Sequence, residues 1–330
     1  MDTKLADTVF GLRKEDLSGH ALEVFEFQYR HNPTYQAYVD LLRVDPAAVR
    51  AIHQIPFLPI SLFKSKLVQT TIFDPEIIFE SSGTTQEMKS RHLVKHISIY
   101  QQSFTQAFEK NYGPVDGWCI LGLLPSYLEQ GHSSLVYMVE SLVTKSGHPQ
   151  SGFYLYEFRR LFEVIQQLEE QGQPTLLIGV TFALLDFAET CQMALRQTLV
   201  IETGGMKGRR KELTRPEVHD FLKQKLGVDR IHSEYGMTEL LSQAYSKGEG
   251  VFLPPPWMQV LVRADDDPSD IRELGGGMIN VIDLANIFSC SFIATDDLGR
   301  VAGDGSFEVL GRADNSDLRG CNLMLFKDQQ

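Results

Sequence analysis

The sequence has no long apolar run. None approaches the about 20 residues that a membrane-spanning helix needs, and Met1-Asp2-Thr3-Lys4 lacks the charged-then-apolar pattern of a signal peptide. Basic residues are in the minority, because 31 Lys and Arg stand against 43 Asp and Glu for a formal net charge of -12. We therefore expect a cytoplasmic protein with no membrane span and no extended basic face for nucleic acid.

Cysteine is sparse and is not arranged as a metal site. The four residues show neither CxxC spacing nor the histidine pairing typical of zinc, and a reducing compartment would leave them as thiols. Three of them are interpreted as core residues, namely Cys119, Cys191 and Cys290. The fourth, Cys321, is a candidate nucleophile.

Strand and helix patterns alternate through most of the chain, and its 330 residues can bury a large core. Apolar runs typical of strands occupy residues 118–124, 175–180 and 199–203. Helical spacing occupies residues 132–144, 156–171, 183–195 and 215–226. This alternation predicts an α/β fold with mostly parallel sheets flanked by helices.

The pattern changes after the prolines at 254–256. Short apolar strands at 258–262, 278–282, 288–293 and 307–310 fit a smaller, barrel-like β subdomain. We interpret residues 1–250 as an α/β nucleotide- and acid-binding region, 251–310 as the β-rich subdomain and 311–330 as a tail carrying Cys321. Further expectations are short helices within 14–50, a strand at 73–79, a helix at 92–112 and a tight turn at Gly275-Gly276-Gly277.

A hydroxyl-rich segment follows the strand expected at 73–79. It consists of Ser81, Ser82, Gly83, Thr84 and Thr85, with Lys89 four residues further on. Hydroxyl and backbone N–H donors beside a cation suit the phosphates of a nucleotide, although the GxxxxGK[ST] spacing of a Walker loop is absent. The alternative is a Ser/Thr-rich turn that caps the next helix.

Three other segments carry polar or glycine-rich turns. Glu202-Thr203-Gly204-Gly205 ends an expected strand, where glycines let the backbone approach adenine or an acyl carbonyl. Tyr235-Gly236-Met237-Thr238-Glu239 follows another strand, at the edge where open α/β sheets bind ligands, unless it merely opens an exposed helix. Thr295-Asp296-Asp297-Leu298-Gly299 lies in the β-rich part, followed by Arg312.

In this order the segments resemble the adenylate-forming enzyme superfamily, which activates carboxylic acids with ATP to acyl-adenylates. The resemblance implies the large domain of that fold, with the hydroxyl-rich segment and Lys89 at the phosphates. Gln86 and Met88 replace a glycine and a proline of the family pattern.

The resemblance also implies roles for the later segments. Tyr235 and Gly236 would lie at the adenine ring, Thr238 at the α-phosphate, and Glu239 on Mg2+, which prefers oxygen ligands. Asp297 would accept hydrogen bonds from the ribose with help from Arg312. Asp296 replaces a family glycine, so either aspartate could hold the ribose.

The C-terminal residues resemble one particular family within this superfamily. Few residues follow Arg312, so we expect this protein to lack the second domain of a full ligase, about 100 residues with an assisting lysine. Arg319-Gly320-Cys321 resembles the end of the acyl-protein synthetase subunit of the fatty acid reductase of luminous bacteria, whose cysteine receives the acyl group. Cys321 would then pass a fatty or aryl acyl group to an acyl-reductase-like or carrier protein.

His132 follows the strand at 118–124, where family members line the acid-binding pocket. It would orient the substrate carboxylate, although a histidine at a helix start is also a common cap or surface residue. Two other functions stay open. One is a ligase that acylates coenzyme A or a carrier protein, similar to phenylacetate-CoA ligases, and the other is a noncatalytic nucleotide-binding subunit.

Overall fold

A computed structural model describes residues 6, 8–81, 88–124, 132–205 and 213–313 of the chain. It divides into two compact units. Unit 1 contains Met1–Ile78, Ser90–Ile97 and Leu253–Gln330, and unit 2 contains Phe79–Lys89 and Ser98–Phe252. Both ends of the chain therefore fall in unit 1, and the middle forms unit 2.

Unit 2 is built on a parallel sheet with the strand order β8-β7-β6-β4-β5. Its strands are β4 (Cys119–Leu123), β5 (Gly152–Phe153), β6 (Thr175–Gly179), β7 (Thr198–Glu202) and β8 (His232–Tyr235). The short β9 (Ala244–Ser246) pairs antiparallel with β8. Every residue of β4 and β6 is buried, as expected for parallel strands that are covered on both faces.

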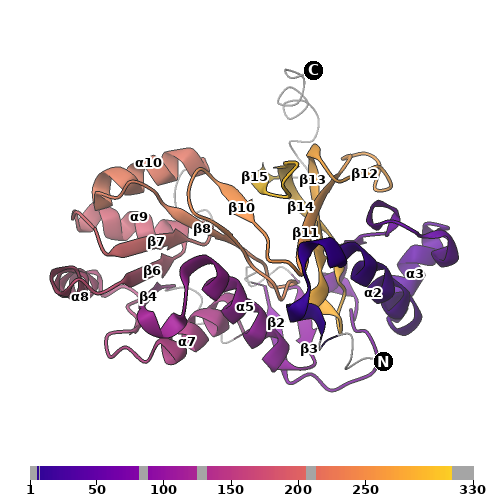
Figure 1. Cartoon of the computed structure of the whole chain (residues 1–330), viewed down its shortest axis with the longest axis horizontal. Helices are drawn as coiled ribbons and strands as arrows, with labels where there is room; N and C mark the ends of the chain where they lie inside the picture. Colours follow the sequence, from indigo (N-terminus) through magenta and orange to yellow (C-terminus); the bar gives the residue numbers. More distant parts are fainter. Residues whose placement is uncertain (1–5, 7, 82–87, 125–131, 206–212, 314–330) are drawn as a thin grey trace. The chain divides into compact units, whose positions relative to one another are not determined.

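Helices cover both faces of this sheet and confirm the predicted α/β class. Figure 1 shows α9 and α10 on one side of the strands, with α5 and α7 on the other. The helices around this sheet are α5 (Ile97–Tyr112), α7 (Ser134–Ser146), α8 (Phe158–Gln171), α9 (Thr181–Thr190) and α10 (Arg215–Leu226). The amphipathic spacing explains the helices: in α8 the buried residues are Leu161, Val164, Ile165 and Leu168.

Unit 1 holds an antiparallel sheet with the strand order β12-β11-β13-β14-β15. Its strands are β11 (Met258–Arg263), β12 (Ile271–Arg272), β13 (Gly275–Asp283), β14 (Phe292–Val301) and β15 (Phe307–Arg312). The N-terminal part adds β1 (Leu58–Pro59), which runs parallel to β14. It also adds α2 (Leu17–His31), α3 (Pro33–Leu41) and α4 (Leu62–Ser65).

Aromatic rings join the N-terminal helices to this sheet within unit 1. Phe25 and Tyr35, from α2 and α3, lie 6.3 Å and 6.0 Å from the ring centroid of Phe292 on β14. Such contacts contribute about 0.5–1.5 kcal/mol each beyond the apolar area that they bury. Helices α2 and α3 therefore contribute to this unit's core, although they stand more than 200 residues from β14 in the sequence.

The remaining elements are short. The strands are β2 (Ile77–Glu80), β3 (Arg91–Val94) and β10 (Val251–Leu253). The 3-10 helices are η1 (Val9–Gly11), η2 (Lys14–Asp16), η3 (Pro46–Ala48), η4 (Ile52–Gln54), η5 (Val115–Gly117) and η6 (Leu284–Asn286).

Several predicted bounds were wrong. The helix expected at 92–112 begins only at Ile97, because the residues before it form β3, where His92 is buried and its Nε2 lies 2.9 Å from Asn286 Oδ1. The strand expected at 73–79 is β2, which starts at Ile77, and the one expected at 288–293 starts at Phe292 and continues to Val301.

The glycine run at 275–277 is not a turn but the start of β13. A Cβ on Gly277 would lie 2.4 Å from the carbonyl oxygen of Arg263 on the neighbouring strand. The glycine is needed there because the two backbones approach closely.

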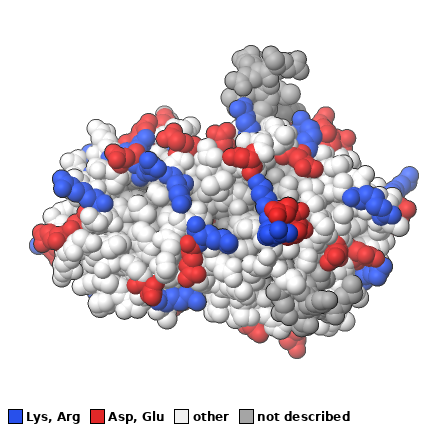
Figure 2. Space-filling view, viewed as in Figure 1, with Lys and Arg blue, Asp and Glu red and all other residues white. Residues whose placement is uncertain are grey.

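Within the described ranges, none of the helices combines the length and the apolar character needed to cross a bilayer. On the face shown in Figure 2, Lys and Arg are interspersed with Asp and Glu.

Candidate active site

The carboxyl ends of β6, β7 and β8 lie together at one edge of the sheet in unit 2. Gly179, the last residue of β6, is in register with Glu202, the last residue of β7, and Glu202 is in register with Ser233 of β8. The loops that follow these strands therefore leave the same edge, which is where open α/β sheets bind ligands.

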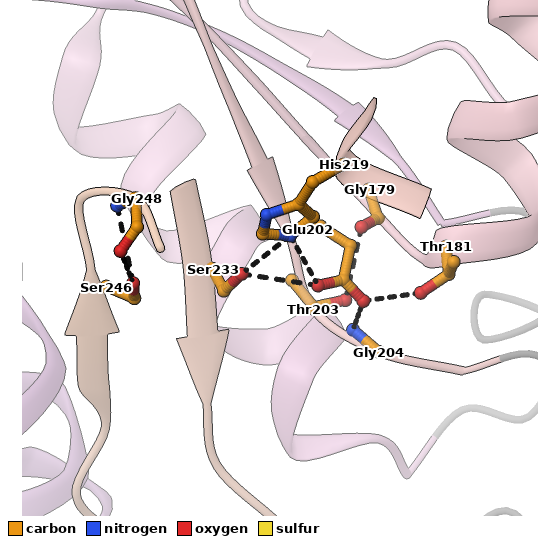
Figure 3. Close-up of polar contacts among 9 residues, drawn as sticks. All are labelled: Gly179, Thr181, Glu202, Thr203, Gly204, His219, Ser233, Ser246 and Gly248. Carbon is orange, nitrogen blue, oxygen red and sulfur yellow. Dashed lines mark hydrogen bonds and ion pairs between the residues drawn. The ribbon is translucent and has the colours of Figure 1, made fainter. Parts of the chain in front are cut away.

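Glu202 is the centre of a buried hydrogen-bonded cluster at this edge (Figure 3). Its Oε1 accepts hydrogen bonds from the Thr181 hydroxyl at 2.5 Å and from the Gly204 amide at 2.7 Å. Its Oε2 accepts one from the Ser233 hydroxyl at 3.3 Å and lies 3.8 Å from Nε2 of His219 on α10. Thr181, Ser233 and His219 are all buried, so the carboxylate is surrounded by protein donors.

These donors keep the buried carboxylate ionised. Burial alone would raise the pKa of Glu202, but contacts with His219 and Thr181 and the charge of Arg215 oppose it, and the pKa lies below its ordinary value. The cluster is not a nucleophilic triad. One nitrogen of His219 faces both Ser233, at 3.3 Å, and Glu202, whereas a triad histidine uses a different nitrogen for each partner.

The turn after β7 is held by its backbone as well. Gly204 and Gly205 have φ values of +78° and +93°, which L-residues rarely adopt. The Gly204 carbonyl accepts a hydrogen bond from the Thr181 amide at 3.0 Å, and the Thr203 amide donates to the Gly179 carbonyl at 3.0 Å. The structure thus brings the predicted residues Gly204 and Gly205 to the ligand edge, in a turn tied to the β6–α9 loop.

The segment after β8 lies at the same edge. Tyr235 is buried, and its ring centroid lies 5.9 Å from that of Phe252. Thr238 and Glu239 form a turn that the Leu240 amide closes by donating to the Met237 carbonyl at 3.1 Å, and Glu239 is buried. The alternative that this segment opens an exposed helix is wrong, because β9 follows it without a helix.

A second buried carboxyl group lies beneath Gly236. A Cβ on Gly236 would lie 2.4 Å from Oε1 of Glu234, so only glycine fits there without a shift. Burial, with a contribution from the charge of Glu202, raises the pKa of Glu234 to about 8. Its cross-strand neighbour Tyr245 is also buried, and among the described residues the hydroxyl has no hydrogen-bond partner.

Lys89 and His132 each contact Glu80, the residue directly before the predicted phosphate segment. The Glu80 amide donates to the His132 carbonyl at 2.9 Å, and Lys89 Nζ lies 3.7 Å from Glu80 Oε2. The side chain of His132 is exposed. Ser81 follows Glu80, whereas Ser82, Gly83, Thr84 and Thr85 lie outside the described residues.

The next helix, α5, lies beyond β3, and the Ile97 amide at its start donates to Oε2 of Glu76 at 2.8 Å. Because residues 82–85 lie outside the described residues, the alternative that this segment caps a helix is not tested.

Asp297 and Arg312 lie in unit 1, opposite each other on β14 and β15. Arg312 Nε is 3.9 Å from Asp297 Oδ1, and the Asp297 side chain is 18% exposed. Asp296 is exposed. Of the two aspartates, Asp297 is therefore the one paired with the predicted arginine.

The three cysteines expected in the core are confirmed as buried thiols. Burial raises the pKa of Cys119 to about 11 and that of Cys290 to about 12, so neither thiolate forms readily near neutral pH. Cys321 and Arg319 lie outside the described residues.

Within the described ranges, no group of three or more His, Cys, Asp or Glu side chains could hold a metal ion. A magnesium ion bound through one carboxylate and substrate phosphates does not need such a group. Glu239 supplies one buried carboxylate beside the ligand edge, which fits that arrangement.

Sequence reasoning missed the partners of Glu202. Thr181, Ser233 and His219 come from three segments with no shared motif. The signal was Glu202 itself, because an acidic residue that ends an apolar strand needs donors when it is buried.

The fold of this chain is similar to that of solved structures of other proteins. MatB from Rhodopseudomonas palustris, solved with ATP bound, matches with a TM-score of 0.53 and 18% identity, over 74% of this chain and 50% of that one. The long-chain-fatty-acid-CoA ligase FadD1 from Archaeoglobus fulgidus matches with a TM-score of 0.50 and 16% identity, over 74% and 54%. The chain thus spans about half the length of these solved structures.

The sequence profile of the acyl-protein synthetase, LuxE, family matches residues 12–329, so the chain belongs to that family of acid-activating ligases. The long-chain-fatty-acid--luciferin-component ligase of Aliivibrio fischeri is 24% identical over 353 residues, covering 98% of this chain and 91% of the relative. The fold class and the enzyme class predicted from the motifs are confirmed.

Proposed function

We propose that the protein activates a fatty or aryl carboxylic acid with ATP and transfers the acyl group to Cys321. The observation that carries the proposal is the convergence at one sheet edge of the Gly204-Gly205 turn, which Glu202 holds, and the Tyr235–Glu239 segment. Backbone groups at such an edge suit a nucleotide.

In the adenylation step, different residues would bind different parts of ATP. Tyr235, Gly236 and the two turn glycines would bind the nucleoside, Thr238 the α-phosphate, and Lys89 with residues 81–85 the outer phosphates. Asp297 and Arg312 would hold the ribose. Mg2+ on Glu239 would supply charge compensation for the phosphates.

The chemistry has two steps. A substrate carboxylate oxygen, oriented by His132, bonds to the α-phosphorus while the bond to pyrophosphate breaks. The Cys321 thiolate then bonds to the acyl carbon and AMP leaves. The thioester passes to a protein acceptor, and the A. fischeri relative, named for a luciferin component, supports a fatty acid as substrate.

Isotope exchange tests the first step. Wild-type protein incubated with ATP, labelled pyrophosphate and a panel of fatty and aryl acids is expected to form labelled ATP only when a suitable acid is present. Lys89→Ala is expected to slow this exchange by about 100–1,000-fold, in the range measured for loss of one charge-stabilising donor. ATP binding without exchange for any acid would instead indicate a noncatalytic nucleotide-binding subunit.

A labelling experiment tests the second step. With labelled acid, ATP and no thiol acceptor, we expect label that survives denaturation, is released by hydroxylamine and is absent from Cys321→Ser. Cys119→Ser is the matched control, because that thiol is buried and should not be acylated. Exchange without protein labelling, together with acyl-CoA formation when coenzyme A is added, would support a coenzyme A ligase instead.

A further inference from the structure

The backbone of Gly204 is hydrogen-bonded through both its amide and its carbonyl. Its amide donates to Glu202 Oε1 at 2.7 Å, and its carbonyl accepts from the Thr181 amide at 3.0 Å. The Thr181 hydroxyl donates to the same Oε1 at 2.5 Å. Three hydrogen bonds therefore close a ring through Glu202, Thr181 and Gly204.

This ring of hydrogen bonds fixes the conformation of the Gly204-Gly205 turn, whose ordering costs conformational entropy. Gly204 and Gly205 both have positive φ, and glycine loses more conformational freedom on folding than other residues. A hydrogen bond to an ionised acceptor is about twice as strong as a neutral one, and this carboxylate stays ionised although it is buried. Protein contacts thus hold the turn in place.

From this geometry we infer that Glu202 is a positioning residue for nucleoside recognition: its carboxylate holds the Gly204-Gly205 turn in the shape that binds the adenosine part of ATP. The inference rests on the proposed function and adds to it a residue that touches no substrate. Because the turn would contact the nucleoside and not the outer phosphates, the effect of Glu202 should depend on which part of the nucleotide is tested.

Binding of two probes by calorimetry tests this directly. AMP reports on the nucleoside, and inorganic tripolyphosphate reports on the phosphate contacts alone. Glu202→Met removes both acceptor oxygens at similar length, and we expect it to weaken AMP binding about tenfold or more. Glu202→Gln keeps one acceptor and Thr181→Val keeps the Gly204 bond, so each should weaken it about two- to fivefold. Tripolyphosphate binding should stay within about twofold in all three variants.

The opposite end of β7 offers a matched control. There the Glu169 carboxylate accepts a hydrogen bond from the Thr198 hydroxyl at 2.6 Å and from the amides of Arg196 and Gln197 at 2.8 Å and 3.0 Å. Glu169→Met and Thr198→Val thus remove the same kinds of contact away from the ligand edge. Both should bind AMP like the wild type.

The outcomes separate the inference from the proposed function. Unchanged AMP binding in Glu202→Met overturns the inference, as does an equal loss for AMP and tripolyphosphate, which would indicate a general loss of structure. If Glu202→Met does not fold, the same comparison decides with Glu202→Gln and Thr181→Val. If the wild type itself binds no AMP and shows no acid-dependent exchange, the proposed function has failed instead.

Discussion

At the scale of single residues, two buried carboxyl groups one strand apart behave in opposite ways. Glu202 meets donors on both oxygens, and its pKa lies below the ordinary value. Glu234 is buried near that negative charge, and its pKa is raised to about 8. Opposed environments of this kind often mark functional sites, and here they flank the ends of two strands that the proposed nucleotide would meet.

The raised pKa of Glu234 predicts a pH-dependent contribution to stability. The carboxyl ionises near pH 4.5 in the unfolded chain and near 8 in the folded one, so unfolding releases a proton between these values. Stability from this group is complete below about pH 4.5 and decreases, by at most about 1.4 kcal/mol per pH unit, as pH rises to 8. Glu234→Gln, which stays neutral, should therefore gain stability relative to the wild type as pH rises from about 5 to 8.

Urea unfolding of both proteins at several pH values measures this difference. Glu109→Gln, at an exposed site on α5, controls for the loss of one negative charge. A difference between Glu234→Gln and the wild type that does not change with pH would contradict the predicted protonation of Glu234.

At the scale of elements, helix ends carry local signals that the sequence makes visible. α10 begins with a capping box between Thr214 and Glu217, and it ends at Gly227 in the left-handed region. α8 ends in the same way at Gly172. Both helices were predicted with nearly these bounds because helical periodicity is a local pattern in the sequence.

The two terminal glycines predict different costs for the same substitution. Gly172→Ala adds a Cβ that meets nothing within 4 Å, so the φ of +69° alone should destabilise the protein, by about 1–2 kcal/mol. In Gly227→Ala the Cβ would also lie 2.8 Å from the Cα of Ala194, a backbone atom. Overpacking should add about 1–3 kcal/mol. Equal free energies of unfolding for the two variants in urea would show that the contact with Ala194 relaxes freely.

Other elements were mispredicted because their signals come from neighbours in space. β3 was merged with α5, since His92 and the two residues after it read equally well as the first turn of a helix. The glycines at 275–277 suggested a turn, and only their close approach to Arg263 makes them a strand. A single sequence contains no record of these cross-strand contacts.

At the scale of the whole molecule, the sequence indicated the class of site but not its internal construction. The Glu202 and Tyr235 segments could be placed at one edge, because the carboxyl ends of parallel strands meet there. The ring through Thr181 and the contact with His219 could not, because these residues come from different loops and helices. For the same reason the packing of the first two helices on β14 had no local signal.

Ligand binding should appear in the thermal stability of the whole protein. A ligand at 100 times its dissociation constant stabilises the folded state by about 2.7 kcal/mol, which raises the melting temperature of a chain this long by a few degrees. We expect Mg2+ with ATP to raise it more than ATP in EDTA, because the ion would link the phosphates to the buried carboxylate of Glu239. In Glu239→Gln the extra increase from Mg2+ should disappear while the increase from ATP alone persists. An undiminished Mg2+ effect in this variant, measured by scanning calorimetry, would assign the ion to other groups.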